Sequence, residues 1–243
     1  MKKIFLLMAM AAMAMACDSE VKPTPGNGGV EDDGDDVVTA IQIDGKYSDW
    51  DGLEGVQVAT LPKGDVEYEQ LKTFKVYADE TFIYVFCEFD PENTLVFVPY
   101  FDLDNDPSTG NDSKWNGAGY EAKAEGDVFE EVETDDGPVQ GAPKAWDPSF
   151  YMYTDSGTEK VCASGIGAVM SSVPAQYNGG STWAFEAAIV RELIAGPYNL
   201  GSEVTFGMIQ YDLDWQYIGK LPCKTWDDRD AGQLETMLTV TLP

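Results

Sequence analysis

After Val38 the chain is divided into short apolar runs by Gly, Pro, Asn and Asp residues. Alternating or continuous apolar runs of this length are typical of β-strands, whereas an amphipathic helix repeats its apolar positions every three or four residues. Many short strands with turns between them predict an all-β fold, a two-sheet antiparallel β-sandwich of the immunoglobulin-like or jelly-roll type. The expected strands are residues 38–43, 55–60, 71–78, 82–89, 95–102, 118–124, 127–133, 149–154, 158–163, 166–171, 182–190, 203–213 and 234–242.

Two segments carry strong hairpin signals. Asp79-Glu80-Thr81 separates two runs of aromatic and β-branched residues, and Asn178-Gly179-Gly180 precedes another such run. Residues of these types favour the tight turns that join antiparallel strands. Helical periodicity is nearly absent, and we expect one short helical segment at 190–194, just before Gly196-Pro197.

The first sixteen residues are typical of a secretory signal peptide. Lys2 and Lys3 precede an apolar stretch that ends in small residues and is shorter than the roughly 20 residues that span a bilayer. The segment Ala14-Met15-Ala16-Cys17 resembles the lipobox of bacterial lipoproteins, which implies a lipid on Cys17. The alternatives are a signal peptide cut before Cys17 without lipidation, and a short anchor that stays uncleaved.

Residues 17–37 are rich in Pro, Gly and acidic side chains and offer little to bury. We expect a lipidated, disordered tether here, followed by one β-sandwich domain over residues 38–243. Asp18-Ser19-Glu20 resembles the export signal of surface-displayed lipoproteins in some Gram-negative bacteria, although Asp at this place retains lipoproteins at the inner membrane in others. We therefore expect a surface-exposed outer-membrane lipoprotein of the cell envelope that touches the membrane only through its lipid.

The charge of the chain limits its partners. The formal net charge is −28, which repels nucleic acid and anionic lipid headgroups. We expect no nucleic-acid partner. The charge suits a neutral glycan, a cation or a basic protein instead.

Four motifs follow one another along the expected domain. Ile43-Asp44-Gly45 is followed by Asp49-Trp50, residues 101–110 read FDLDNDPSTG, Gly119-Tyr120-Glu121 comes next, and residues 183–189 read WAFEAAI. In this order they resemble the family 9 carbohydrate-binding modules and their relatives in the DOMON-like superfamily, over essentially residues 40–243.

The resemblance implies a β-sandwich that binds sugar without catalysis, with aromatic side chains holding the sugar ring and calcium stabilising the sandwich. The superfamily also contains haem-binding domains, but this chain has no His, so we expect no haem. We expect a lipoprotein that captures polysaccharide or oligosaccharide, with outer-membrane glycan-uptake proteins as its partners.

One acidic loop has the oxygen donors that Ca²⁺ prefers. Its donors fall within eleven residues, and the alternate placement of the first ones is a spacing with which a turning loop wraps calcium. The other interpretation is a solvated turn whose carboxylates cap backbone N–H groups. The expected metal ligands are Asp102, Asp104, Asn105, Asp106 and Asp112.

Several aromatic residues lie in polar segments without strand periodicity, where we expect their rings to stay in solvent and stack on a sugar. The other interpretation is that these loops fold back over the sandwich and bury the rings. By contrast, we expect structural roles for Trp50 and Trp183. The candidate sugar-binding rings are Trp115, Tyr120, Trp146, Trp215 and Trp226, and the candidate polar partners are Asn116, Gln216 and Arg229.

Two other functions stay open beside sugar binding. A glycoside hydrolase or lyase needs only two suitably spaced carboxylates, and the chain has 43 acidic residues. However, without His the chain has no Ser-His-Asp or Cys-His triad, and no residue pattern singles out a catalytic pair, so we expect no enzyme. The third possibility is a structural or adhesive lipoprotein that binds another protein.

Three cysteines follow Cys17, and an odd number permits at most one intramolecular disulfide. Cys87 lies in an apolar run, and we expect it to be a small core residue. The pairing of Cys162 and Cys223 stays open.

Overall fold

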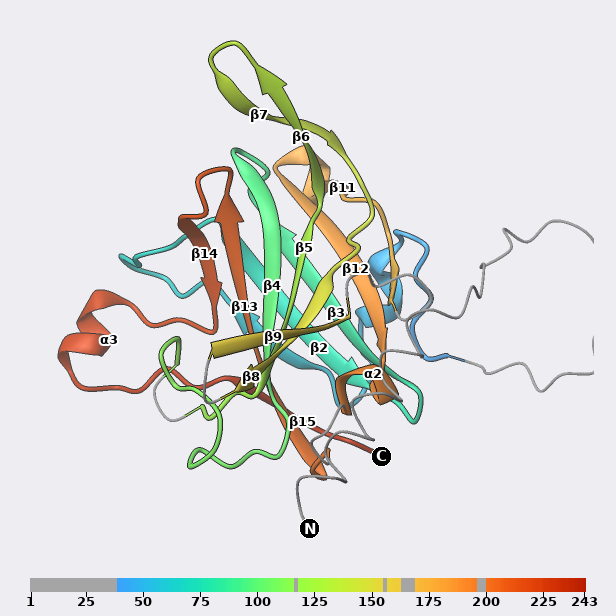
Figure 1. Ribbon diagram of the computed structural model, residues 1–243, viewed down its shortest axis with the longest axis vertical. Helices are drawn as coiled ribbons and strands as arrows, with labels where there is room; N and C mark the ends of the chain where they lie inside the picture. The colour runs from blue at the N-terminus through green and yellow to red at the C-terminus, as the bar shows by residue number, and fades with distance from the viewer. Residues whose placement is uncertain (1–38, 116–117, 155–156, 163–168, 196–199) are drawn as a thin grey trace, which may run out of the picture.

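The computed structural model describes residues 39–115, 118–154, 157–162, 169–195 and 200–243 (Figure 1). The expected signal peptide, Cys17 and the tether lie outside these ranges. Within them, no helix has the length and apolar character needed to cross a membrane. The elements are η1 (Tyr47–Trp50), β1 (Gln57–Thr60), β2 (Leu71–Ala78), β3 (Phe82–Phe89), β4 (Thr94–Asp102), β5 (Ala122–Asp127), β6 (Phe129–Thr134), β7 (Gly137–Pro143), β8 (Ser149–Thr154), β9 (Gly157–Cys162), β10 (Val169–Ser171), β11 (Ala175–Tyr177), η2 (Asn178–Gly180), β12 (Thr182–Val190), α2 (Arg191–Ala195), β13 (Glu203–Asp212), β14 (Tyr217–Leu221), α3 (Trp226–Asp230) and β15 (Leu238–Thr241).

Most of the strands form two antiparallel sheets that pack against each other, which confirms the expected all-β sandwich. Sheet A has the order β1-β2-β3-β12-β10, with β11 also paired to β12. Sheet B has the order β14-β13-β4-β5-β8-β9, with β15 also paired to β13. β6 and β7 form a separate two-stranded hairpin, which projects beyond the sandwich (Figure 1).

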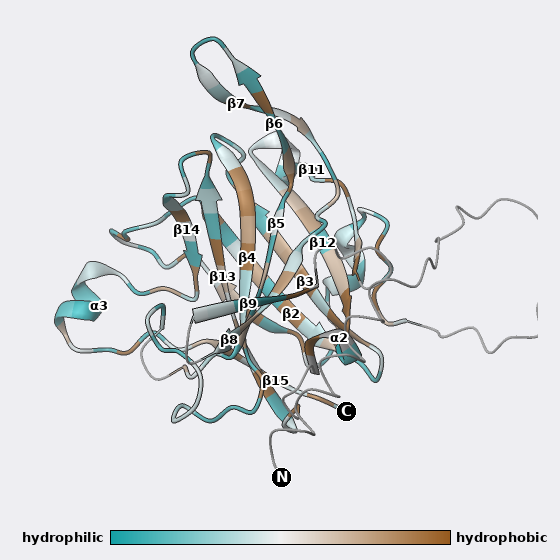
Figure 2. Ribbon diagram, in the orientation of Figure 1, coloured by the Kyte–Doolittle hydropathy of each residue, from teal (hydrophilic) through white to brown (hydrophobic). Residues whose placement is uncertain are grey.

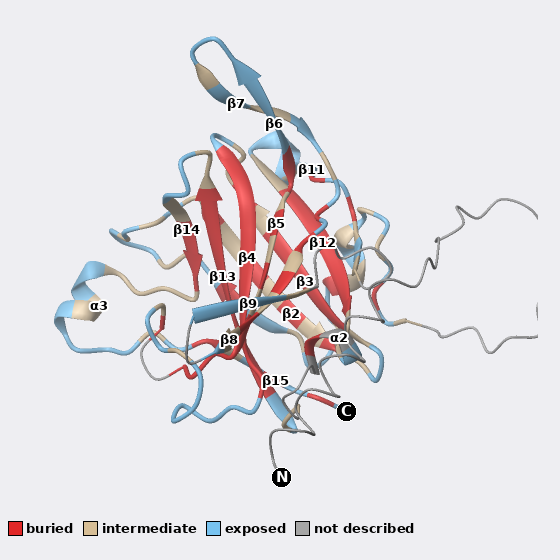
Figure 3. Ribbon diagram, viewed as in Figure 1, coloured by how far each residue is buried: buried red, intermediate tan, exposed pale blue. Residues whose placement is uncertain are grey.

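The core lies between the two sheets, where aromatic rings from both layers meet edge to face. Phe97 of sheet B contacts Phe89 and Phe185 of sheet A, with ring centroids 4.9 Å and 5.0 Å apart. Figure 3 shows the consequence, since the central strands of both sheets are buried while the β6–β7 hairpin and α3 are largely exposed. In Figure 2 the central strands of both sheets are more hydrophobic than the β6–β7 hairpin and α3. Burial of this apolar surface, at about 25 cal/mol per Å², is what offsets the chain entropy lost on folding.

The outer face of sheet A is also covered, by the segment that precedes β1. Ile41 and Trp50, which are 1% and 3% exposed, pack on Tyr84 and Phe86 of β3. The structural role expected for Trp50 is therefore confirmed. Trp183 is partly buried against the main core, as a structural residue should be. This segment thus covers the outer face of β3 and β12.

The strand predictions are accurate wherever a strand is rich in aromatic and β-branched residues. β2, β3, β8 and β12 begin and end at the expected residues, and α2 and both hairpin turns are present where expected. The pattern missed β7, β11 and β14, which carry Pro, Gly, Gln or Lys inside short strands. Residues 39–43 are irregular although Ile41 is buried, so a buried position was mistaken for a strand.

Candidate functional site

Sheet B carries a row of tyrosines on its outer face. Because successive strand residues point to opposite sides, the core-facing Phe97 and Phe101 of β4 alternate with the outward Val98 and Tyr100. Neighbouring strands add tyrosines to the same side. We call this surface the tyrosine face, and its residues are Tyr100, Tyr151, Tyr153, Tyr211 and Tyr217.

Polar groups hold the tyrosine face together. The hydroxyl oxygens of Tyr100 and Tyr211 lie 3.2 Å apart and share a hydrogen bond. Burial raises the pKa of both hydroxyls, so they stay neutral and can both donate and accept. Tyr151, Tyr153 and Tyr217 are only partly buried. Tyr100 and Tyr211 are themselves buried, so the rings that the face offers to a ligand are the three partly buried ones.

A rigid turn at one edge of the face extends it with Trp215. The turn joins β13 to β14, and Asp212 Oδ1 accepts hydrogen bonds from the backbone N–H groups of Asp214 and Gln216 at 2.9 Å and 2.8 Å. Trp215 has φ of 59°, a left-handed conformation that is rare for a bulky residue. Its ring is 50% exposed and its centroid lies 5.7 Å from that of Tyr211. The turn thus presents a half-exposed indole beside the tyrosines.

The long loop between β4 and β5 covers another part of this side of sheet B. Trp115 lies against β13 at Gly207, where an added Cβ would come within 2.6 Å of the indole ring. The indole nitrogen of Trp115 donates to the backbone carbonyl of Pro222 at 2.9 Å. Glycine at position 207 is therefore what lets this loop pack down on the sheet.

The expectation that all five candidate rings stay in solvent is wrong for three of them. Trp115, Tyr120 and Trp146 are 1%, 0% and 2% exposed and present no face to a ligand. Tyr120 packs edge to face on Tyr100, with centroids 5.0 Å apart. Trp146 enters the main core, and its indole nitrogen donates to the carbonyl of Phe97 at 3.2 Å. Their loops are polar in sequence but fold back over the sandwich.

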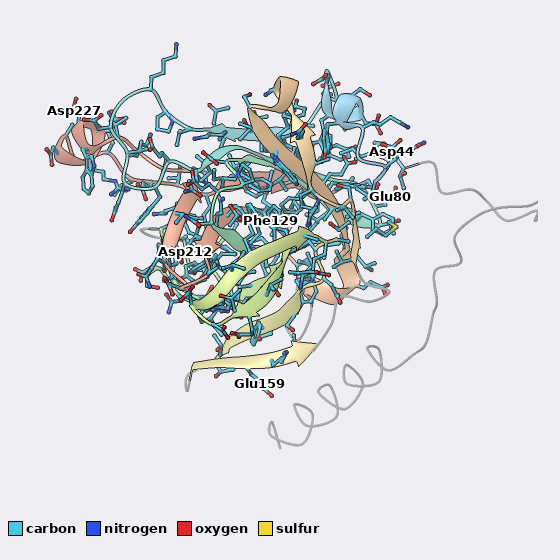
Figure 4. All side chains as sticks on the ribbon, turned by 90° about the horizontal axis from the view of Figure 1, so that it is seen from above. Asp44, Glu80, Phe129, Glu159, Asp212 and Asp227 are labelled. Atoms are coloured by element: carbon cyan, nitrogen blue, oxygen red, sulfur yellow. The ribbon has the colours of Figure 1, made fainter. Side chains whose placement is uncertain are left out.

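Trp226 stays exposed, at 47%, but lies on α3 apart from Trp215. Figure 4 shows Asp212, at the start of the Trp215 turn, and Asp227, beside Trp226, at separate parts of the surface, with Phe129 inside the sandwich. Arg229 stacks on Trp226, with its guanidinium carbon 4.8 Å from the ring centroid.

The remaining polar candidates have partners within the protein. Arg229 forms ion pairs with Glu67 at 2.6 Å and Glu235 at 2.8 Å, rather than with a neighbouring Asp. The Gln216 amide nitrogen donates to the carbonyl of Asp214 at 2.9 Å, within the turn. Asn116 lies outside the described residues.

Three carboxylates meet at the end of β4 where the acidic loop begins. Asp102, Asp104 and Glu121 offer oxygen atoms that all lie within 4.8 Å of one another. Asp102 and Glu121 are each only 2% exposed, and burial raises the pKa of both carboxyl groups. We call these three residues the acidic cluster.

The acidic cluster fits a hard divalent cation. Asp102 Oδ1 is buried and has no hydrogen-bond partner among the described residues. An unpartnered buried carboxylate oxygen destabilises a fold unless a positive charge compensates it. Carboxylate oxygens are the ligands that Ca²⁺ prefers. Asp102, Asp104 and Glu121 would hold such an ion, and calcium would supply the missing positive charge.

The acidic cluster differs from the set expected from sequence. Asp106 caps a turn instead, with Oδ1 accepting from the backbone N–H of Ser108 at 2.9 Å. Asp112 is exposed and does not belong to the cluster. The side-chain amide of Asn105 donates to Glu203 at 3.1 Å. The alternative interpretation of a capped turn therefore holds for the tip of the loop, while its base carries the carboxylates.

Sequence reasoning missed Glu121 because it follows the loop rather than lying within the acidic run. Asn111 and Tyr120 form an isolated β-bridge that closes the loop. At Gly119, with φ of 54°, an added Cβ would lie 2.4 Å from the carbonyl oxygen of Asp106. Because of this close approach, the end of the loop lies beside its beginning. There Glu121 Oε2 accepts a hydrogen bond from the backbone N–H of Leu103 at 2.8 Å. The motif Gly119-Tyr120-Glu121 is the signal that could have found it.

Among the described cysteine side chains, Cys87 and Cys223 are free thiols. Cys87 is fully buried, which confirms its place in the core. Burial raises the pKa of Cys223 to about 11, so its thiol stays protonated and unreactive at neutral pH.

Comparison of the chain with models of known protein families and with curated proteins gives no match. The function is therefore inferred from the residues themselves.

Proposed function

We propose that this protein is a non-catalytic carbohydrate-binding lipoprotein of the cell envelope, and that its ligand lies on the tyrosine face against Trp215. The observation that carries the proposal is the Trp215 turn. A bulky residue in the left-handed region costs roughly 1–3 kcal/mol and persists where the surrounding structure enforces it, commonly at functional sites. Here the strained residue is a half-exposed indole.

The rings beside Trp215 suit a sugar. The face of a pyranose carries C–H groups that pack on a flat aromatic ring, and its hydroxyls need hydrogen-bond partners at the ring edge. Tyr211 lies between Trp215 and Tyr217, with centroid distances of 5.7 Å and 5.0 Å. Tyr211 is buried and supports its two neighbours, so the half-exposed indole of Trp215 offers the apolar face and the partly buried Tyr217 offers a phenol hydroxyl beside it.

We also propose that calcium at the acidic cluster stabilises the loop that covers sheet B. The loop brings Trp115 and Tyr120 onto the sheet, and Tyr120 packs on Tyr100. An ion held by Asp102, Asp104 and Glu121 would tie the start of the loop to its end. In this proposal calcium acts on the support of the tyrosine face and does not touch the ligand.

The test is binding of the full chain, in mild detergent, to a panel of immobilised polysaccharides and oligosaccharides. Trp215→Ala should lower affinity at least tenfold, which corresponds to about 1.4 kcal/mol. Trp226→Ala is the matched control, because Trp226 is equally exposed but lies on α3, and it should bind as the unchanged chain does. Binding that survives Trp215→Ala would contradict the proposal.

The same panel separates the other functions. Release of shortened or unsaturated sugars from a polysaccharide would favour a glycoside hydrolase or lyase. No binding to any glycan, together with specific capture of one envelope protein, would favour an adhesive lipoprotein.

A further inference from the structure

Four lysines lie over aromatic rings on the outer side of sheet B. Lys114 Nζ lies 4.7 Å from the ring centroid of Tyr217, and Lys220 Nζ lies 5.0 Å from that of Trp115. Lys123 and Lys160 both lie over Tyr151, at 5.0 Å and 5.5 Å. In a chain with only 15 basic residues and a net charge of −28, this is a concentration of positive charge.

The strand register places these lysines on the tyrosine face. Lys123 of β5 is paired with Tyr100 on one side and Tyr151 on the other. Lys160 of β9 is paired with Tyr151. Lys220 of β14 is paired with Ile209, which belongs to the cluster beneath the tyrosines, and Lys114 reaches the face from the covering loop.

Within the described part of the chain, two of these lysines have acidic partners and two do not. Lys123 forms an ion pair with Glu125, and Lys220 forms one with Glu235. Among the described residues no carboxylate pairs with Lys114 or Lys160, and Lys114 donates to the hydroxyl of Tyr217 instead. Burial lowers the pKa of Lys114, and the charges of Lys123 and Lys220 lower it further. Lys114 thus holds a partly buried charge that no carboxylate among the described residues pairs with, and an anion would compensate it.

Lys114 is close to the proposed sugar platform. Its ammonium lies over Tyr217, which contacts Tyr211, and Tyr211 contacts Trp215. An ammonium at the edge of such a row can pair with a negative group on a sugar whose ring stacks on the aromatic side chains. The acidic residues near this row include Asp212, Asp214 and Glu125. Asp212 accepts from backbone N–H groups of its own turn, and Glu125 forms an ion pair with Lys123.

We propose that the tyrosine face binds an anionic sugar, a pyranose that carries a carboxylate or a sulfate ester, with Lys114 as the residue that recognises the charge. This inference rests on the proposed sugar-binding function and names its ligand class. It departs from the neutral glycan that the net charge alone suggests, because local charge at the site, rather than the total, decides what a ligand meets at contact.

The test compares charged and neutral forms of the same polymers with the full chain. Polygalacturonate is paired with its fully methyl-esterified form, and dextran sulfate with dextran. The charged member of at least one pair should bind at least tenfold more tightly, and the pair that shows the difference identifies carboxylate or sulfate. The preference should shrink as salt is added.

The decisive variant is Lys114→Met, which keeps the apolar stem and removes the charge. It should abolish the preference for the charged polymer while the neutral polymer binds as before, and Lys114→Arg should retain part of the preference. Lys75→Met is the matched control, because Lys75 Nζ lies 5.0 Å from the ring centroid of Phe86 on the opposite side of the sandwich. A circular-dichroism melt of each variant checks that it folds.

Each outcome is distinct. Equal binding of charged and neutral polymers that still depends on Trp215 would overturn the inference and leave sugar binding intact. Tight binding of single-stranded DNA that competes at the same face would overturn it as well, because the site would then recognise anions without a sugar. Absence of binding to every glycan would remove the proposed function itself.

Discussion

The indole nitrogen of Trp50 donates a hydrogen bond to the buried carboxylate of Glu186 at 2.9 Å. The two residues come from the first and the last of the four sequence motifs. The other oxygen of Glu186 accepts from the backbone N–H groups of Gly45 and Asp44, at 2.9 Å and 3.2 Å. One carboxylate on β12 therefore fixes the segment that covers the outer face of β3 and β12.

Glu186→Gln should destabilise the fold by about 1–3 kcal/mol, because the amide nitrogen would place a donor against at least one of the three N–H donors in a site that is fully buried. Urea unfolding followed by circular dichroism measures the loss. Trp50→Phe with Glu186→Gln should lose less than the sum of the two single changes. Additive losses would show that the hydrogen bond contributes nothing.

The motifs were visible in the sequence, but their contact was not. Asp44-Gly45, Trp50 and Glu186 stand out as residues, and strands β2, β3 and β12 follow from their aromatic and β-branched content. Which buried carboxylate meets which indole depends on the pairing of β3 with β12, and no local pattern records that pairing.

The loop aromatics were misplaced for a similar physical reason. The residues around Trp115 are polar, and polarity predicts a solvated loop. The space that receives its ring is created on another strand by Gly207, which is distant in sequence. Trp215 does stay exposed, as expected, because the polar turn residues Asp212 and Asp214 lie beside it in the sequence.

Gly207→Ala tests this packing. A methyl group 2.6 Å from the Trp115 ring should displace the loop and destabilise the fold by about 1–3 kcal/mol. Tryptophan fluorescence should shift to the red as Trp115 meets water, and urea unfolding gives the loss in free energy. In a Trp115→Leu background Gly207→Ala should lower the free energy of unfolding much less. An equal loss in both backgrounds would show that the added methyl group clashes with a residue other than Trp115.

Calcium should raise the melting temperature of the full chain. Ligand at 100 times its dissociation constant adds about 2.7 kcal/mol of stability. Asp102→Asn should abolish this response, yet without calcium it should be as stable as the unchanged chain or more so, because it removes an unpartnered buried charge. Asp112→Asn, in the same loop but outside the acidic cluster, should respond as the unchanged chain does. A melting temperature that does not change at millimolar calcium would show that the acidic cluster binds no calcium.

Glu235 joins the tyrosine face to α3, because it pairs with both Lys220 and Arg229. Burial alone would raise its pKa, but the two ion pairs outweigh burial and hold the pKa below its ordinary value. The carboxylate therefore stabilises the fold above about pH 4.5, and this stabilisation is lost as the pH falls through the lowered pKa of the folded state.

Glu235→Gln should cost about 2–3 kcal/mol at pH 7, because it leaves Lys220, which is 8% exposed, without a carboxylate. The free-energy difference from the unchanged chain, measured by urea unfolding, should shrink as the pH is lowered toward 3. Lys46→Met is the control, since the pair of Lys46 with Asp44 is exposed and its loss should leave unfolding almost unchanged at either pH. An equal loss in the free energy of unfolding at pH 3 and pH 7 would mean that the shape of the Glu235 side chain, rather than its charge, stabilises the contact between β14 and α3.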